Sequence, residues 1–284
     1  MRRPTGHQRV CIPPASGHTR TMGLATRLVS TPAWRVFAKY YYPFITRHGA
    51  DDVALLNLGY EEDPPMAIPL SESDEPDRYC IQLYHRTATQ ADIAGKRVLE
   101  VSCGHGGGAS YLMRTLHPAS YTGLDLNPAG IEVCRSTHRL PGLDFVQGDA
   151  QNLPFPDNSF DVVVNIEASH CYPSVPRFFA EVARVLRPGG QLLYADVRHS
   201  DHVAEWEAEL ADAPLRMRSK EIISEQVVRG LEKSLPRSQN MFTRRTPALF
   251  RGLVRDAVAA SNSKICRGLQ NGESSYRMYC FENE

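Results

Sequence analysis

The amino-acid sequence predicts an α/β fold, in which a doubly wound and mostly parallel sheet carries helices on both faces. Two observations predict this fold class. Short apolar stretches that end in an acidic residue alternate with helix-like stretches over residues 96–198. The first apolar stretch also leads through a glycine-dense loop into a helix, an order of elements that begins a crossover between parallel strands.

The first strand is expected at 98–101 and leads into the loop Ser102-Cys103-Gly104-His105-Gly106-Gly107-Gly108. Glycines let the chain turn tightly and let a ligand lie against bare backbone, while the following helix offers unpaired N–H groups. Ser102 stands where the dinucleotide-binding pattern has its first glycine. The loop therefore predicts a nucleotide-type ligand, but a dinucleotide is not the best candidate.

The second strand, expected at 119–124, ends in Asp125 about 20 residues after the loop. A carboxylate at that distance can accept hydrogen bonds from both hydroxyls of a ribose. The third strand, expected at 143–147, is followed by Gly148-Asp149-Ala150, and the fourth, at 159–166, by Glu167. Each of these strands thus ends in an acidic residue at the edge of the sheet where ligands bind.

A fifth strand is expected at 191–196, after a turn at Pro188-Gly189-Gly190. Alternating residues at 275–281 predict a last strand, which we expect to be antiparallel. Between 199 and about 260 the strand patterns are absent. Helices are expected at 82–94, 128–137, 176–186, 205–210, 222–231 and 249–259.

Four further segments give the sequence a closer resemblance. They are YEEDPPM at 60–66, LYHRTAT at 83–89, EASHCYP at 167–173 and YRMYCF at 276–281. With the strand order above, they resemble the S-adenosylmethionine-dependent methyltransferases and, among these, the mycobacterial phthiotriolone/phenolphthiotriolone dimycocerosates methyltransferases. The resemblance implies a seven-stranded Rossmann-like sheet, S-adenosyl-L-methionine as cofactor, and O-methylation of a hydroxyl on a long-chain lipid of the cell envelope.

The resemblance also implies how the chain is divided. Residues 96–198 form the cofactor-binding core, 199–265 a helical substrate cap and 266–284 the last strand of the sheet. Residues 22–95 form a helical lid region, in which 24–47 is a helix that either packs on the core or lies at a membrane surface, and the acidic, proline-rich stretch 49–80 covers the cofactor. Residues 1–21 are a disordered tail or a wrongly assigned start, with Met22 as the alternative start.

The expected cofactor site follows from the same resemblance. The loop from Glu100 to Gly106 lies under the methionine part, Asp125 holds the ribose, and Asp149 with Ala150 meets the adenine, whose amino group requires an acceptor. The expected cofactor-binding residues are Glu100, Ser102, Gly104, Gly106, Asp125, Leu126, Asp149, Ala150 and Ile166.

Methyl transfer to an alcohol requires alignment of the acceptor and removal of its proton. His170, just after the fourth strand, is the best candidate base, because an imidazole can accept a proton near neutral pH. Glu167 either orients His170 or meets the cofactor. The alternative is that His170 only packs in its loop, and His85 and His199 are weaker candidates for the base.

Three other functions stay open at this point. The acceptor can be a fatty acid or another glycolipid. The segment from Glu167 to His170 also resembles sterol C-methyltransferases, which must stabilise a carbocation and for which Tyr40, Tyr41, Tyr42 and Tyr172 could supply aromatic faces. A protein that only binds the cofactor or a lipid through a decayed site is the alternative that is not an enzyme.

The amino-acid composition limits which binding partners and which cellular compartment are expected. With 32 basic and 32 acidic residues, the chain carries no net charge, and it has no long basic run to follow a nucleic-acid backbone. Seven cysteines without a C-x-x-C pair suit reduced thiols, so no metal is expected. We expect a cytoplasmic location, either free in the cytoplasm or at the inner face of the membrane. No stretch reaches the ~20 apolar residues of a membrane span, although peripheral contact is compatible with a lipid acceptor. Nothing in the sequence predicts the oligomeric state.

Overall fold

The computed structural model describes residues 55, 57–244 and 248–284. All of them belong to one compact unit that spans residues 43–284. The predictions for the tail at 1–21 and for the helix at 24–47 lie outside the described residues. Within the described residues, none of the helices is both long and apolar enough to cross a membrane.

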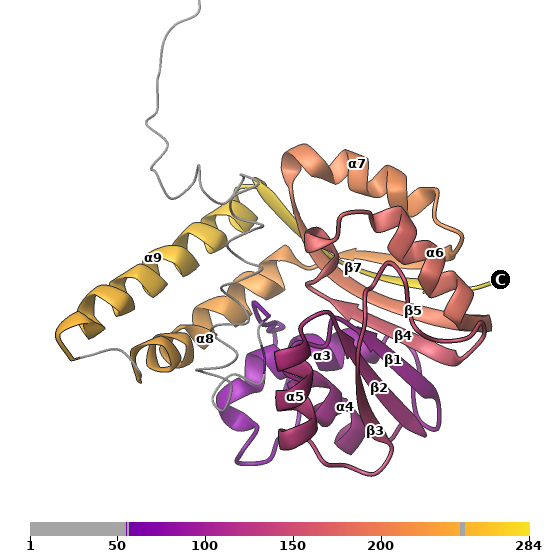
Figure 1. Ribbon diagram of the computed structural model, residues 1–284. Coiled ribbons are helices and arrows are strands. Elements are labelled where there is room, and N and C mark those ends of the chain that lie inside the picture. Colours follow the sequence, from indigo (N-terminus) through magenta and orange to yellow (C-terminus); the bar gives the residue numbers. More distant parts are fainter. Residues whose placement is uncertain (1–54, 56, 245–247) are drawn as a thin grey trace, which may run out of the picture. The chain divides into compact units, whose positions relative to one another are not determined.

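A seven-stranded sheet forms the centre of this unit (Figure 1). Its strand order is β3-β2-β1-β4-β5-β7-β6, and every pair is parallel except β5 with β7 and β6 with β7. The strands are β1 Arg97–Val101, β2 Ser120–Asp125, β3 Leu143–Gln147, β4 Phe160–Ile166, β5 Leu186–His199, β6 Arg216–Ile222 and β7 Ser274–Glu282. The direction of strand succession reverses between β1 and β4, and a ligand of such a sheet binds at the carboxyl ends of these strands.

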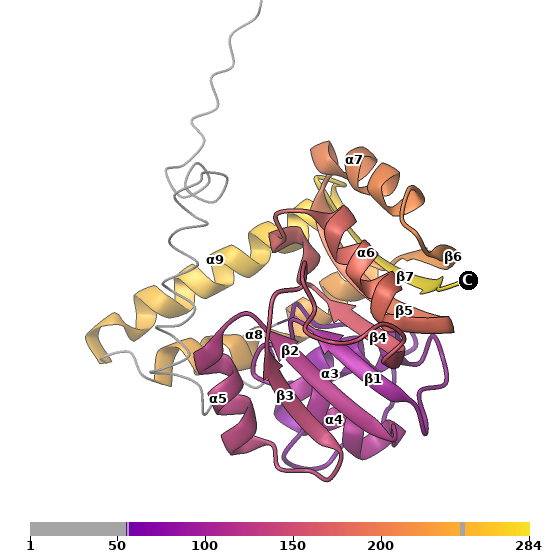
Figure 2. The same ribbon diagram turned by 45° about the vertical axis from the view of Figure 1, so that its right-hand side comes forward.

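Helices cover both faces of the sheet, as the fold class predicts. The helices are α3 Arg78–Ala88, α4 Gly107–Leu116, α5 Pro128–Thr137, α6 Val175–Val185, α7 Ser200–Ala211, α8 Ser224–Arg244 and α9 Arg251–Gln270, and the 3-10 turns are η2 Glu75–Asp77, η3 Ser169–Cys171 and η4 Ala248–Phe250. Along β4, Val162 and Val164 join the core under α3, α4 and α5, whereas Val163 joins the core under α6 and α7. Figure 2 shows α6 and α7 together on one side of β5 and β7.

The boundary predicted for the fifth strand is wrong. β5 already begins at Leu186, so the expected turn at Pro188-Gly189-Gly190 lies inside the strand. The pairing with β4 shifts there, from Phe160 opposite Leu186 to Val162 opposite Gln191. Gly189 adopts a φ of +73°, which lets the chain bulge and then continue as a strand.

The prediction that no strand lies between residues 199 and 260 is also wrong. β6 pairs with β7 along the edge of the sheet, and nearly all of its residues are exposed. Because neither of its faces is buried, β6 lacks the alternation of apolar and polar residues by which strands are predicted. The segment 199–265 is therefore not a purely helical cap: α7 also packs on the sheet through the buried side chains of Trp206 and Leu210.

The packing of the last strand can be tested at Phe281. Its side chain is fully buried, and its ring lies 5.3 Å from that of Phe179 between centroids. We expect Phe281→Ala to lower the free energy of unfolding by about 3–5 kcal/mol, measured by urea denaturation. Ile222→Ala, at an exposed position of β6, should change it by less than about 0.5 kcal/mol. Equal effects of the two substitutions would show that β7 is not part of the cooperative core.

Candidate active site

The loop after β1 turns through three residues with left-handed backbone conformation. The φ angles are 64° at Ser102, +57° at Gly104 and +78° at Gly106. A Cβ atom at Gly106 would come within 2.8 Å of the Phe145 ring, so only glycine fits where α4 begins. Ser102 adopts this conformation at a cost, and its Oγ forms a hydrogen bond of 2.6 Å with the hydroxyl of Tyr172.

Asp125 at the end of β2 holds the loop in place. Its Oδ2 accepts a hydrogen bond of 3.0 Å from the Gly104 N–H, and its Oδ1 accepts one of 2.9 Å from the Asn127 N–H. Burial raises the pKa of this carboxyl group. Each carboxylate oxygen can accept more than one hydrogen bond, so Asp125 retains capacity for two hydroxyl donors.

Glu100 lies beneath the loop and is almost fully buried. Its two oxygens accept hydrogen bonds of 2.8 Å from the Tyr84 hydroxyl and 2.9 Å from the Tyr121 hydroxyl. Burial raises the pKa of Glu100 to about 7. Because both of its oxygens already accept hydrogen bonds from tyrosines, Glu100 supports the loop from the interior of the protein.

The other expected cofactor residues lie at the ends of neighbouring strands. Leu126, after β2, is 66% exposed, whereas Ala150 and Ile166 are buried. Asp149, after β3, is exposed, and its Oδ1 accepts a hydrogen bond of 2.9 Å from the Gln151 N–H. Since β3, β2, β1 and β4 are consecutive in the sheet, the fold brings all of the predicted residues to one edge.

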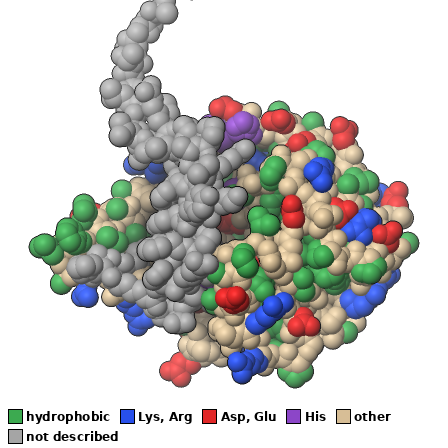
Figure 3. Space-filling model, in the orientation of Figure 1, with side chains coloured by type: hydrophobic (Ala, Val, Ile, Leu, Met, Phe, Trp, Pro, Cys, Tyr) green, Lys and Arg blue, Asp and Glu red, His purple; other side chains and the backbone are tan. Residues whose placement is uncertain are grey.

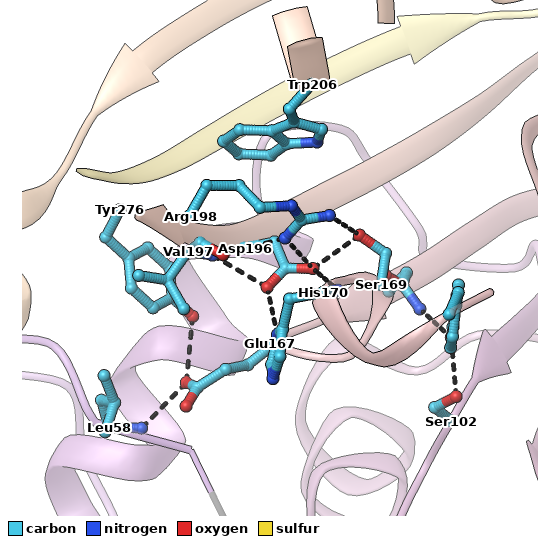
Figure 4. A network of polar contacts seen from close by, with 12 residues as sticks. Leu58, Ser102, Glu167, Ser169, His170, Asp196, Val197, Arg198, Trp206 and Tyr276 are labelled. Atoms are coloured by element: carbon cyan, nitrogen blue, oxygen red, sulfur yellow. Dashed lines mark hydrogen bonds and ion pairs between the residues drawn. The ribbon is translucent and has the colours of Figure 1, made fainter. Parts of the chain in front are cut away.

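His170 lies in η3, after β4, and is held by Asp196 of β5 (Figure 4). Its Nδ1 lies 2.8 Å from Oδ1 of Asp196, and its backbone N–H donates to Oδ2 of the same carboxylate over 3.0 Å. This pairing leaves Nε2 as the ring nitrogen available to a substrate, and the side chain is 36% exposed.

The Asp196 carboxylate is fully buried, and it controls the charge of His170. Burial alone would lower the pKa of His170, but the neighbouring carboxylate outweighs burial and raises this pKa to about 11. Burial likewise opposes ionisation of Asp196, yet the His170 ring and the Arg198 guanidinium hold its pKa well below the usual range. Asp196 and His170 therefore form an ion pair.

Two further side chains contact Asp196, and a third covers one of them, as Figure 4 shows. The Ser169 hydroxyl donates to Oδ2 over 2.6 Å, and Nη1 of Arg198 lies 3.1 Å from the same oxygen. The Arg198 guanidinium lies over the Trp206 ring, 4.5 Å from its centroid. Sequence reasoning missed the role of Asp196, although an acidic residue near the end of a strand is the signal that identified Asp125.

Of the two roles predicted for Glu167, the structure gives the orientation of His170 to Asp196 instead, whereas contact of Glu167 with the cofactor stays a prediction. Oε2 of Glu167 instead accepts hydrogen bonds of 2.9 Å from the Leu58 N–H and 3.1 Å from the Tyr276 hydroxyl. Burial raises the pKa of Glu167 to about 7. Glu167 thus connects the end of β4 both to the stretch before α3 and to β7.

The weaker histidine candidates have other contacts. Nδ1 of His85 lies 2.8 Å from the Tyr111 hydroxyl, and burial lowers the pKa of this histidine. His199 is the N-cap residue of α7 and is exposed. In the part of the chain that the structure describes, no three His, Cys, Asp or Glu side chains are grouped so that they could hold a metal ion.

The sheet with its switch between β1 and β4, the glycine loop and the acidic residue after β2 define the class of protein. It is an S-adenosylmethionine-dependent methyltransferase, and a family model described as a methyltransferase domain matches residues 99–194. The fold resembles that of geranyl diphosphate C-methyltransferase from Streptomyces coelicolor A3(2), solved with S-adenosyl-L-homocysteine. The TM-score is 0.60 at 16% identity, covering 90% of this chain and 99% of that chain.

Two relatives are far closer in sequence. The phthiotriol/phenolphthiotriol dimycocerosates methyltransferase of Mycobacterium tuberculosis is 56% identical over 267 residues, which cover 94% of this chain and 99% of the relative. The fatty-acid O-methyltransferase of Mycolicibacterium smegmatis is 57% identical over 244 residues, 86% of this chain and 88% of the relative. The chain belongs to the family of mycobacterial phthiotriol/phenolphthiotriol dimycocerosates methyltransferases. The predicted fold class, enzyme class and cofactor are confirmed.

The role of Asp125 can be tested by substitution. We expect Asp125→Ala to weaken binding of S-adenosylmethionine by about 10-fold or more, because charge-assisted hydrogen bonds to the loop and to the ribose are both lost. Isothermal titration calorimetry measures this effect. Asp144→Ala, on the exposed surface of β3, is the matched control and should bind as the wild type does. Unchanged affinity of Asp125→Ala would exclude the ribose role.

Proposed function

We propose that this enzyme O-methylates a hydroxyl group of a long-chain lipid. The acceptor that we propose belongs to the phthiotriol/phenolphthiotriol dimycocerosates, the lipid class that appears in the names of its relatives. The observation that carries the proposal is the His170–Asp196 pair at the edge of the sheet that also carries the cofactor loop. The identity of 56% over nearly the whole length of the Mycobacterium tuberculosis relative supports the choice of acceptor. We place the reaction in the cytoplasm, where the free cysteines among the described residues stay reduced.

The cofactor lies, in this proposal, across the carboxyl ends of four strands. The loop from Ser102 to Gly106 contacts its methionine part, and the N–H groups at the start of α4 face it. Asp125 and Leu126 contact the ribose, while Asp149, Ala150 and Ile166 surround the adenine. S-adenosylmethionine supplies a methyl group on a positively charged sulfur.

His170 is the general base of the proposed reaction. The proton of the acceptor hydroxyl passes to Nε2, the oxygen lone pair forms the new C–O bond, and the S–C bond breaks to leave a neutral thioether. Asp196 holds the ring in the tautomer that exposes Nε2 and stabilises the imidazolium that results. A positively charged cofactor bound at this edge of the sheet would lower the pKa of His170 and so favour its neutral form.

A fatty-acid carboxylate is the second candidate acceptor. The Mycolicibacterium smegmatis relative, named a fatty-acid O-methyltransferase, is 57% identical to the chain. A carboxylate is already ionised at neutral pH, so its methylation requires no base. The dependence on His170 therefore separates the two acceptors.

Transfer of a labelled methyl group from S-adenosylmethionine tests the function. We expect label in a mycobacterial lipid extract to enter a methyl ether on a long-chain lipid, which resists alkaline hydrolysis. Label that alkali releases as methanol would identify an ester and therefore a fatty-acid acceptor. Label on a chain or ring carbon would contradict O-methylation, and binding of the cofactor without any transfer would contradict the proposed function.

Substitution of His170 tests the proposed base. We expect His170→Gln to lower kcat with a hydroxylated lipid by about 10²–10⁴-fold while cofactor affinity stays within about twofold. His85→Gln is the matched control and should leave kcat unchanged. A His170→Gln enzyme with the wild-type rate would exclude His170 as the base.

The pH dependence of the reaction rate also tests the role of His170 as the base. The base must be unprotonated, and the pKa of His170 in the free enzyme is raised from 6.5 to about 11, so kcat/KM for S-adenosylmethionine should rise with pH through neutrality into the alkaline range. Asp196→Asn removes the negative charge that raises this pKa, so the rise should move toward pH 6.5. A profile of the wild-type enzyme that is already flat at pH 6 would contradict the prediction.

A further inference from the structure

The tip of the helical hairpin formed by α8 and α9 exposes large apolar side chains. This tip, residues 248–255, comprises η4 and the first residues of α9. Leu249, Phe250 and Leu253 are 87%, 52% and 70% exposed, so they contribute little to the core. The two helices lie side by side and extend from the sheet in Figure 1, and Figure 3 shows hydrophobic side chains gathered over the end of the hairpin.

The same part of the chain has a strong excess of positive charge. Six basic and no acidic residues lie between Glu232 and Asp256, in a chain whose net charge is zero. Two of them, Arg251 and Arg255, are exposed within the tip itself. Apolar side chains flanked by arginines match the boundary between headgroups and acyl chains of an anionic bilayer.

We propose that the tip docks on the surface of an anionic lipid bilayer. Leu249, Phe250 and Leu253 enter the acyl boundary, and Arg251 and Arg255 contact lipid phosphates. The inference rests on the proposed function in one respect, because a long-chain lipid acceptor resides in a membrane. It assigns the peripheral membrane contact to the end of the α8–α9 hairpin that lies away from the sheet.

The hairpin links this tip to the catalytic edge of the sheet. α8 begins next to β7, where the Ser224 hydroxyl accepts a hydrogen bond of 3.0 Å from the Tyr276 N–H. Tyr276 in turn donates to Glu167 at the end of β4. With 21 residues, α8 is about 30 Å long, so the tip lies far from the reacting atoms. Docking therefore brings the enzyme to its lipid acceptor, and it does not change the chemical step.

The tip fits a bilayer better than a second protein surface. A stable protein interface buries about 800 Å² on each partner, and three exposed apolar side chains do not supply that area. Two copies of the tip would also bring arginines of like charge together. Insertion into lipid requires neither a large complementary surface nor an opposite charge on a second copy.

Flotation with lipid vesicles tests the proposal. The full-length protein should float with vesicles of phosphatidylcholine and phosphatidylglycerol, and much less with phosphatidylcholine alone. Leu249→Glu with Leu253→Glu should lower the bound fraction at least tenfold. Arg251→Gln with Arg255→Gln should weaken binding by about thirty-fold, from roughly 1 kcal/mol for each arginine. Met217→Glu, at an exposed apolar position of β6, is the matched control and should float as the wild type does.

Methyl transfer separates this proposal from the proposed function. The tip variants should methylate an acceptor dispersed in detergent at the wild-type rate, but an acceptor embedded in anionic vesicles more slowly. Tip variants that float as the wild type does, or a wild type that floats with neither vesicle, would overturn the docking proposal. Self-association that Leu253→Glu abolishes in the absence of vesicles would overturn it in favour of a second copy. Failure of the wild type to methylate any lipid in detergent would overturn the proposed function alone.

Discussion

The Asp196 carboxylate has no exposed surface, and a charge that is buried in this way is stable only if its neighbours satisfy it fully. Its oxygens accept hydrogen bonds from the side chain and the backbone of His170, from Ser169 and from the backbone N–H of Val197, and Arg198 balances its charge. These partners come from the loop after β4 and from β5. Satisfying one carboxylate thus fixes two segments that together hold His170 at the edge of the sheet that also carries the loop after β1.

The loop after β1, where we propose that the cofactor binds, is held in the same way by different groups. Tyr84 and Tyr121 hold Glu100 beneath the loop, and Asp125 holds the loop from the front. The Tyr172 hydroxyl joins the two sides of the site, because it bonds Ser102 in the loop and accepts a hydrogen bond of 2.9 Å from Asn165 of β4. The protein's own side chains therefore determine the shape of the loop, which lowers the ordering cost of binding a ligand.

The sequence predicted the parts of this molecule that follow a local pattern. The strand, loop and helix around residues 98–116 and the acidic residue after β2 are such parts, because periodicity and glycine content determine them. β6 was missed because a strand with two exposed faces has no apolar alternation. The acidic residue at the end of the fifth strand could be seen in the sequence, but its partner could not. The parallel pairing of β4 with β5 brings Asp196 next to the loop that follows β4, where it contacts His170, and the spacing of residues along the chain does not show which strands pair.

The position of β7 has a consequence for how the protein is made. The last strand of the chain lies between β5 and β6, and α8 and α9 separate it in sequence from both. During synthesis β5 therefore has an unpaired edge, flanked by buried apolar residues, until residues 274–282 have left the ribosome. Such an edge can pair with other chains, so the nascent polypeptide depends on rapid pairing of β5 with β7 or on protection by chaperones. A ribosome that stalls before residue 274 would release a chain whose sheet cannot be completed.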